Sequence, residues 1–204
     1  DYTRPTTDYA TVIQSTIDNG CSAVALFAYN ADGAAIITEL RNAGFTGEIY
    51  GTDGIASVTT ADSMSDDLLD GVWATNPGTA ASARGALVDQ LWPTDLVAQG
   101  QFAKEAFDAF TIMAFSAFTQ LATIDATTGI PGITASQAIM ATGTNWDGAT
   151  GPVNFLANGD TLGQGYCVGQ FSATDVGADG EGTVSYDCSY DWGFDNGLVA
   201  TASS

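Results

Sequence analysis

Residues 22–54 carry the strongest structural signal in the sequence; they read SAVALFAYNADGAAIITELRNAGFTGEIYGTDG. The apolar run 22–28 is short and continuous, which is typical of a strand buried on both faces of a parallel sheet. A helix is expected over 34–43, and a second strand over 48–50 leads into the glycine-flanked loop 51–54. A strand, a helix and a strand in this order predict parallel pairing through a right-handed crossover.

The same alternation continues on both sides of this stretch. Further helices are expected over 9–18 and 63–69, and a third strand over 71–75. After residue 75 the pattern changes to helices, over 80–91, 102–123 and 134–143. The last of these opens with a capping box, because Gln137 follows Thr134 by three residues.

The helix over 102–123 should carry a broad apolar stripe made by Phe107, Phe110, Ala114, Ala117, Phe118 and Leu121. Beyond it, Asn158-Gly159 is a strong hairpin signal, with strands expected over 152–156 and near 166–171. The acidic, aromatic tail after Ser172 either binds a cation or folds back onto the body, and the second interpretation is preferred.

Composition excludes several classes of function. The 204 residues include 24 acidic side chains, 4 basic side chains and no histidine, which gives a net charge of −20. Binding to nucleic acid or to an anionic membrane surface requires Lys and Arg, so neither is expected. A Ser-His-Asp or Cys-His site is excluded without histidine. Because the chain also lacks phosphate-loop and G-x-S-x-G motifs, we expect no enzyme activity, no cofactor and no metal site.

Three cysteines are present, so they cannot all pair within one chain. Cys21 opens the apolar run and is expected to pack as a small hydrophobic residue. Cys167 and Cys188 lie in a strand and a returning segment, where a disulfide is possible in an oxidising compartment. The sequence leaves that bridge open, since geometry decides it.

Three residues are candidates for a ligand site. Asp53 follows a predicted parallel strand, and ligands bind outside the carboxyl ends of such strands. A carboxylate there can hold a ligand ammonium, although a turn residue that caps the next segment is the alternative. Tyr29 ends the first strand and should reach the same rim, unless it is an aromatic at the edge of the core. Phe102 begins the long helix and is either a pocket wall or plain core.

Several short motifs occur together in the order of a known family. They lie at 7–9 (TDY), 23–29 with 34–45, 50–54 (YGTDG), 70–73 (DGVW), 107–109 (FDA), 146–160 and 170–171 (QF). This ordered set, over about residues 7–171, resembles the branched-chain amino acid (Leu/Ile/Val-type) ABC transporter substrate-binding proteins. The resemblance implies the type I periplasmic binding fold.

By this resemblance the fold class is α/β, with three-layer parallel-sheet lobes and the second lobe incomplete. The chain resembles the carboxyl-terminal half of such proteins, so that an amino-terminal part of the same protein is missing. Residues 1–75 and 165–204 would belong to the carboxyl-terminal lobe and residues 76–164 to part of the amino-terminal lobe. The chain would cross the hinge near 76 and 164. Missing partner strands should leave the apolar face of the helix over 102–123 under-covered, unless another chain supplies them.

The resemblance also implies a function: an extracytoplasmic component of an ABC importer, which binds an amino acid or a similar small polar solute by lobe closure. Asp53 matches the acid that binds the ligand ammonium, where many relatives carry Glu. Tyr29 matches an aromatic that lines the cleft, and Phe102 matches the side-chain wall. The implied partners are the solute and a membrane permease, and the implied location is periplasmic or extracellular, with anchoring at the cell surface possible. A ligand-binding domain of a sensor or receptor is the alternative; a hydrolase on an α/β sheet fits less well.

Overall fold

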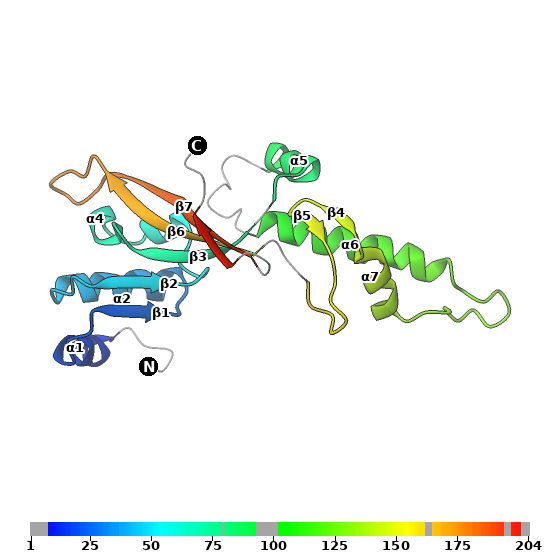
Figure 1. Ribbon diagram of the computed structural model, residues 1–204, viewed down its shortest axis with the longest axis horizontal. Helices are drawn as coiled ribbons and strands as arrows, with labels where there is room; N and C mark the ends of the chain where they lie inside the picture. The colour runs from blue at the N-terminus through cyan, green and yellow to red at the C-terminus, as the bar shows by residue number, and fades with distance from the viewer. Residues whose placement is uncertain (1–7, 79, 93–101, 162–164, 194–196, 201–204) are drawn as a thin grey trace. The chain divides into compact units, whose positions relative to one another are not determined.

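A computed structural model describes residues 8–78, 80–92, 102–161, 165–193 and 197–200 (Figure 1). The chain divides into two compact units. Unit 1 comprises Asp1–Pro77 and Tyr166–Ser204, and unit 2 comprises Gly78–Gly165. The chain therefore changes unit after Pro77 and again after Gly165.

Unit 1 alternates helices and strands and then adds three more strands. In chain order these elements are α1 (Ala10–Asp18), β1 (Ala23–Leu26), α2 (Asn30–Asn42), β2 (Glu48–Gly51), α3 (Val58–Ala61), α4 (Asp66–Leu69), β3 (Trp73–Pro77), β6 (Tyr166–Thr174), β7 (Thr183–Gly193) and β8 (Gly197–Ala200). They build a sheet with the strand order β1-β2-β3-β6-β7-β8. The pairs β1–β2 and β2–β3 are parallel, as predicted, whereas β6, β7 and β8 join antiparallel.

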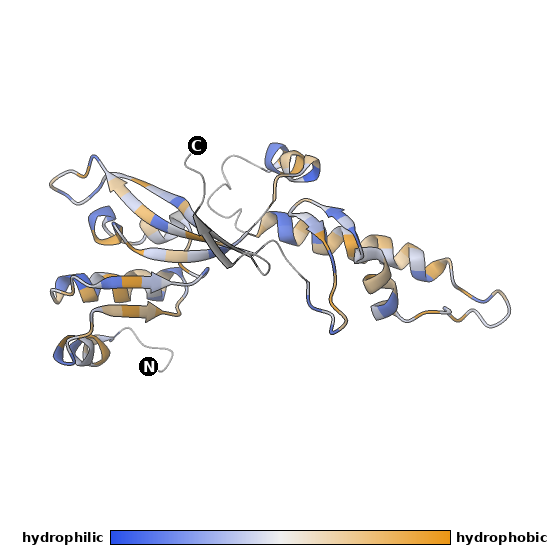
Figure 2. Ribbon diagram, viewed as in Figure 1, coloured by the Kyte–Doolittle hydropathy of each residue, from blue (hydrophilic) through white to orange (hydrophobic). Residues whose placement is uncertain are grey.

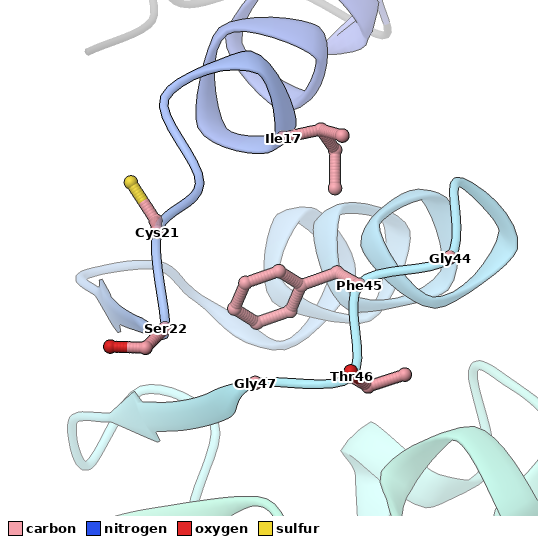
Figure 3. A pocket seen from close by; sticks show the side chains of 7 residues that line it. All are labelled: Ile17, Cys21, Ser22, Gly44, Phe45, Thr46 and Gly47. Carbon is pink, nitrogen blue, oxygen red and sulfur yellow. The ribbon is translucent and has the colours of Figure 1, made fainter.

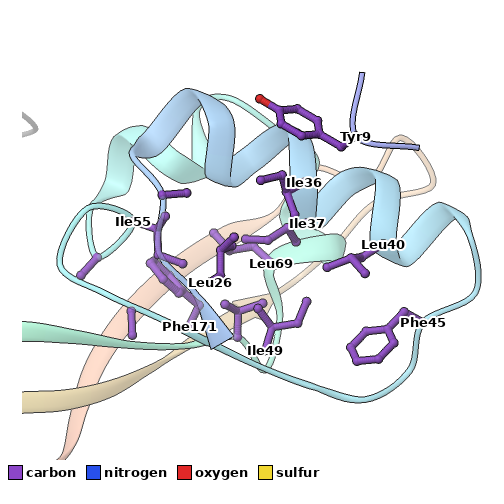
Figure 4. Packing of buried hydrophobic residues seen from close by; sticks show 14 of the residues in the cluster. Tyr9, Leu26, Ile36, Ile37, Leu40, Phe45, Ile49, Ile55, Leu69 and Phe171 are labelled. Atoms are coloured by element: carbon purple, nitrogen blue, oxygen red, sulfur yellow. The ribbon is translucent and has the colours of Figure 1, made fainter. Parts of the chain in front are cut away.

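The core of unit 1 lies between the helices and one face of this sheet. Ile37 and Leu40 point from α2 toward the strands, where Ile49 and Phe171 are also fully buried (Figure 4). Polar and apolar residues both occur along α2, as its mixed colouring shows (Figure 2). Burial of one such side chain stabilises the fold by about 1.5–3 kcal/mol, so these contacts hold α2 onto the sheet.

The expectation that the first strand is buried on both faces is wrong. Leu26 is buried, but Ala23 and Ala25 are exposed. The strand is the terminal member of the sheet order, and its register places Ala25 beside Tyr50, whose side chain is also exposed. Only the face that carries Leu26 and Ile49 belongs to the core with the helices.

Unit 2 contains α5 (Ala83–Leu91), α6 (Ala103–Leu121), α7 (Ala135–Gly143) and a hairpin of β4 (Trp146–Gly148) with β5 (Gly151–Val153). The predicted capping box of α7 is confirmed. The backbone N–H of Gln137 donates to the Thr134 hydroxyl at 3.2 Å, and the Thr134 N–H donates to the Gln137 side-chain oxygen at 2.8 Å.

The apolar stripe of α6 is largely exposed, as expected from the family resemblance. Phe110, Phe118 and Leu121 all face solvent in the described structure, and Phe118 is 69% exposed. The residues of α6 that are buried are Asp108, Ile112 and Ser116, which recur every four residues on another face of the helix. The expected exposure of the apolar face is thus confirmed.

The expected hairpin closes earlier than predicted. Phe155 pairs with Thr161 across the Asn158-Gly159 turn, where Gly159 has a φ of +95°. Residues 166–171 are therefore not the return strand of this hairpin. They belong to β6, which pairs with β3 in unit 1, Val168 lying opposite Thr75. The turn signal was local, whereas the true partner of β6 is distant in the sequence.

The tail after Ser172 folds back, as preferred from the sequence. It forms β7, which pairs with β6 along its length. A disulfide joins Cys167 to Cys188 with the Cα atoms 5.5 Å apart. Cys21 is free and exposed, so its expected packing as a buried hydrophobic residue is wrong. None of the helices in the described ranges is both long and apolar enough to cross a membrane.

Candidate functional site

Two loops of unit 1 meet at the carboxyl ends of the parallel strands. Residues 27–29 follow β1 and residues 52–57 follow β2; we call them the edge loops. Because β1 and β2 are parallel neighbours, both loops leave the sheet at one edge. A Cβ atom added to Gly54 would collide with the carbonyl oxygen of Ala28 and lie 3.5 Å from the Tyr29 Cα. Only glycine permits this approach, which brings the loop of Asp53 against Tyr29.

Tyr29 stands at the junction of β1 and α2. Its backbone is extended, with φ −91° and ψ 165°, and its carbonyl oxygen accepts the Gly33 N–H at 2.7 Å, which starts the helix. Its side chain is 71% exposed. An exposed phenol ring offers an apolar face and can attract a cation.

Phe27 is an exposed aromatic residue at this edge that sequence reasoning missed. Its side chain is 77% exposed, whereas Leu26 and Ala28 are buried. Alternation with period two continues past the end of β1, so Phe27 and Tyr29 project on the same side of the chain. That alternation was visible in the sequence, but the apolar run was interpreted as buried throughout.

Asp53 is half-buried within a turn. Its carbonyl oxygen accepts the Ala56 N–H at 3.2 Å, and the Thr52 carbonyl accepts the Ile55 N–H at 3.1 Å. These backbone bonds give the turn a defined shape. The structure therefore brings Asp53 and Tyr29 to one edge of unit 1, where a carboxylate lies in a loop that touches the aromatic residue's backbone.

A group of hydroxyl and amide side chains lies behind the edge loops. Asn30 donates its amide N–H to the Thr59 hydroxyl, and the hydroxyls of Ser57 and Thr59 are 2.7 Å apart. The Thr60 hydroxyl donates to the Ile55 carbonyl at 2.9 Å. Sequence reasoning missed this hydroxyl network (Asn30, Ser57, Thr59 and Thr60). Its signal was the occurrence of three hydroxyl residues within positions 57–60 after Asp53, which gives no indication of their partner on α2.

Phe102 lies in unit 2, whereas Tyr29 and Asp53 lie in unit 1. It precedes α6 with a left-handed backbone, φ 65° and ψ 12°, and its carbonyl accepts the Ala106 N–H at 2.9 Å. Its side chain is exposed, so Phe102 is not plain core. A left-handed conformation is uncommon for a bulky residue and sets the direction in which the helix begins.

The electrostatic character of the edge loops is acidic. They contain Asp53 and no Lys or Arg. Arg41, the described basic residue of unit 1, donates to the carbonyls of Phe45 and Gly47 at 3.0 Å each, near the amino ends of the strands. With a net charge of −20, the chain favours a positively charged group at this edge. Among the described residues, no group of three or more acidic or thiol side chains is arranged to hold a metal.

A hollow of about 300 Å³ lies at the opposite edge of the sheet. Its lining residues are Ile17, Cys21, Ser22, Gly44, Phe45, Thr46 and Gly47 (Figure 3). These residues precede β1 and β2, and the Cys21 thiol points away from the Phe45 ring (Figure 3). Because ligands of such sheets bind at carboxyl ends, this hollow is not the candidate site.

No family model matches the sequence, and no curated protein matches it. Solved structures do match. A leucine-binding protein, LivK, from Thermotoga maritima has 16% identity and a TM-score of 0.67, over 91% of this chain and 49% of that chain. The branched-chain amino acid binding protein LivJ from Streptococcus pneumoniae, in complex with isoleucine, has 16% identity and a TM-score of 0.61, over 91% and 50%.

An ABC transporter solute-binding protein from Rhodopseudomonas palustris, in complex with benzoate, has 12% identity and a TM-score of 0.62. That match covers 100% of this chain and 50% of the other. These similarities show that the chain has the type I periplasmic binding fold. The chain spans about half the length of each of these proteins.

Proposed function

We propose that this chain is part of an extracytoplasmic solute-binding protein of an ABC importer, and that it binds an amino acid or a similar small polar solute. One observation supports this most. The loops that carry Asp53 and Tyr29 meet at the carboxyl edge of parallel strands, within a fold shared with solute-binding proteins.

The chemistry of recognition follows from the two side chains. The Asp53 carboxylate accepts charge-assisted hydrogen bonds from a ligand ammonium, each contributing about 1.5–3 kcal/mol. The exposed Tyr29 ring adds about 0.5–1 kcal/mol by cation–π attraction. The Phe102 ring serves as an apolar wall for the side chain of the solute. Binding requires no bond to be made or broken, so the proposed protein is not an enzyme.

Whole-protein features are part of the same proposal. Unit 1 corresponds to the carboxyl-terminal lobe and unit 2 to part of the amino-terminal lobe, which close around the solute by hinge motion. The remainder of the fold, supplied by another part of the same protein, contributes the groups for the ligand carboxylate. The loaded protein delivers its solute to a membrane permease from the periplasm or the cell surface.

The choice of an amine-containing solute is supported by comparison with the two ligands of the solved structures. Isoleucine carries an ammonium group, whereas benzoate carries only a carboxylate. A carboxylate ligand placed beside Asp53, in edge loops without Lys or Arg, would meet like charge. An amino acid presents the opposite charge to Asp53.

A ligand series tests this proposal. The full protein is titrated by calorimetry with L-leucine, isoamylamine, 4-methylpentanoate and benzoate, after a thermal-shift screen of all amino acids. We expect binding to require the ammonium group and to weaken about 10- to 100-fold in Asp53→Asn. Asp18→Asn is the matched control, because it removes an acidic charge from α1, where Asp18 accepts a hydrogen bond from Gln14. Equal affinity of wild type and Asp53→Asn would remove Asp53 from the site.

A further inference from the structure

We infer that Thr60 is a positioning residue, whose buried hydroxyl holds Asp53 and Tyr29 in a fixed relation at the carboxyl edge. This inference rests on the proposed role of Asp53 in binding an ammonium group. It concerns the preorganisation of that site. A carboxylate on a loop binds a ligand strongly only if the loop is held in one conformation.

The first anchor of the Asp53 loop is Ile55, which is fully buried. Its side chain fills a notch between two glycines, Gly33 of α2 and Gly51 of β2. A Cβ atom at Gly33 would lie 2.5 Å from the Ile55 Cγ2 atom, and one at Gly51 would collide with Cδ1. The notch exists only because neither position has a side chain, so Ile55 fixes the depth of the loop.

The second anchor is the Thr60 hydroxyl, whose side chain is also fully buried. It has one proton to donate, and the Ile55 carbonyl is the nearer acceptor at 2.9 Å. The Asn30 side-chain oxygen is 3.3 Å away and is the longer contact. The Ile55 carbonyl also accepts the Ser57 N–H at 2.8 Å, a bond within the loop itself. The Thr60 hydroxyl is therefore its second donor and the one that ties this part of the loop to α3.

These two anchors act on both candidate ligand residues. Ile55 follows Asp53 by two positions, and Asn30 follows Tyr29 directly. Asn30 in turn donates to Thr59, the residue before Thr60. The hydroxyl network therefore joins the loop that holds the carboxylate to the helix start that holds the aromatic residue.

A pair of substitutions separates positioning from packing. Thr60→Val keeps the shape of the side chain and removes the hydroxyl, whereas Thr60→Ser keeps the hydroxyl and removes a methyl group. A role in positioning predicts loss of affinity in Thr60→Val and near-normal affinity in Thr60→Ser. A role in packing alone predicts that Thr60→Ser is the more damaging change.

The test measures affinity for L-leucine by calorimetry and backbone amide exchange at Ile55, Ala56 and Ser57 in the full protein. We expect Thr60→Val to weaken binding about 10-fold and to speed exchange in the loop, with Thr60→Ser within about 2-fold of wild type. Thr16→Val is the matched control, because it also removes a hydroxyl that donates to a carbonyl, that of Val12 in α1 at 3.0 Å. Asn30→Ala removes the hydrogen bond to Thr59, another contact of the same hydroxyl network, and tests the positioning role if Thr60→Val folds poorly.

The outcomes are distinguishable. If Asp53→Asn weakens binding as expected while Thr60→Val and Asn30→Ala bind like wild type, the positioning role is refuted and the proposed function stands. If Thr60→Val and Thr60→Ser lose affinity equally, packing explains the effect and the inference is also refuted. If Asp53→Asn binds like wild type, or wild type binds none of the screened amino acids, the proposed function fails and this inference fails with it.

Discussion

Replacement of Asp108 by Asn should destabilise unit 2 by about 2–4 kcal/mol. Asp108 lies on α6, and its side chain is only 4% exposed. Its carboxylate accepts hydrogen bonds from the Ala149 N–H at 2.6 Å, the Thr150 N–H at 2.9 Å and the Thr150 hydroxyl at 2.8 Å. The carboxylate thus holds the turn between β4 and β5 against the helix.

The magnitude follows from what Asn can replace. Its single oxygen can accept one of the two backbone N–H groups, and its NH2 group then faces the other donor. The N–H left without an acceptor costs about 1–3 kcal/mol, and the remaining bond weakens because its acceptor is no longer charged. The Thr150 hydroxyl can rotate and accept from the amide, so that contact is partly retained.

Urea denaturation of the two proteins, followed by circular dichroism, measures the difference in the free energy of unfolding. Asp89→Asn is the matched control in unit 2: its carboxylate is largely exposed and pairs with Lys104 at 2.9 Å, so its loss should cost under about 1 kcal/mol. An Asp108→Asn protein within about 0.5 kcal/mol of wild type would refute the assigned role of the buried carboxylate.

Two further predictions concern burial. Burial raises the pKa of Tyr186 to about 12, so its contribution to stability is complete below pH 10, the ordinary pKa, and is lost as pH rises from 10 toward 12. Tyr186→Phe, which also loses the hydrogen bond to Ala74, should show a shallower decline in the free energy of unfolding between about pH 9 and about pH 11. Identical pH profiles would contradict this assignment. On α6, Ile112→Ala should cost about 2–4 kcal/mol, because Ile112 is 3% exposed, whereas Phe118→Ala should cost under about 0.5 kcal/mol. Chemical denaturation ranks the pair, and the reverse order would show that the stripe of α6 is its buried face.

Features with local causes were predictable from the sequence. The capping box of α7 depends on two side chains three residues apart, Thr134 and Gln137, and both bonds form in the structure. The alternation of helices and strands up to β3 follows from periodicity within short windows, which needs no knowledge of distant contacts. The parallel pairing of β1, β2 and β3 then follows from connection rules.

Features that depend on distant partners were not predictable. Hydrophobic periodicity marks one face of α6 as apolar, but it does not say whether anything covers that face. The exposure of Phe110 and Phe118 was expected only from the family resemblance. Likewise, the apolar run of β1 does not show whether both faces of the strand are covered, and Ala25 is exposed beside Tyr50. The pairing of β6 with β3 joins segments almost a hundred residues apart, and no turn signal encodes it.

The candidate site shows the same division. The rule that ligands bind at carboxyl ends of parallel strands was sufficient to place Asp53 and Tyr29 at one edge. It could not reveal Thr60, because the bond from its hydroxyl to Ile55 requires the helix after the loop to turn back over it. Nor could it assign Phe102 to the same site, since that residue belongs to the other unit.

The location of the anchors also determines what the proposed experiments measure. Gly33, Gly51, Ile55 and Thr60 all belong to unit 1, and Ile55 is part of its hydrophobic core. The geometry of the Asp53 loop is therefore set by contacts within unit 1, whatever covers the apolar face of α6. It follows that a change such as Asp108→Asn should lower the stability of unit 2 without altering amide exchange in the Asp53 loop, whereas Thr60→Val should do the opposite. Faster exchange at Ile55 in Asp108→Asn would show that the carboxyl edge is not organised by unit 1 alone.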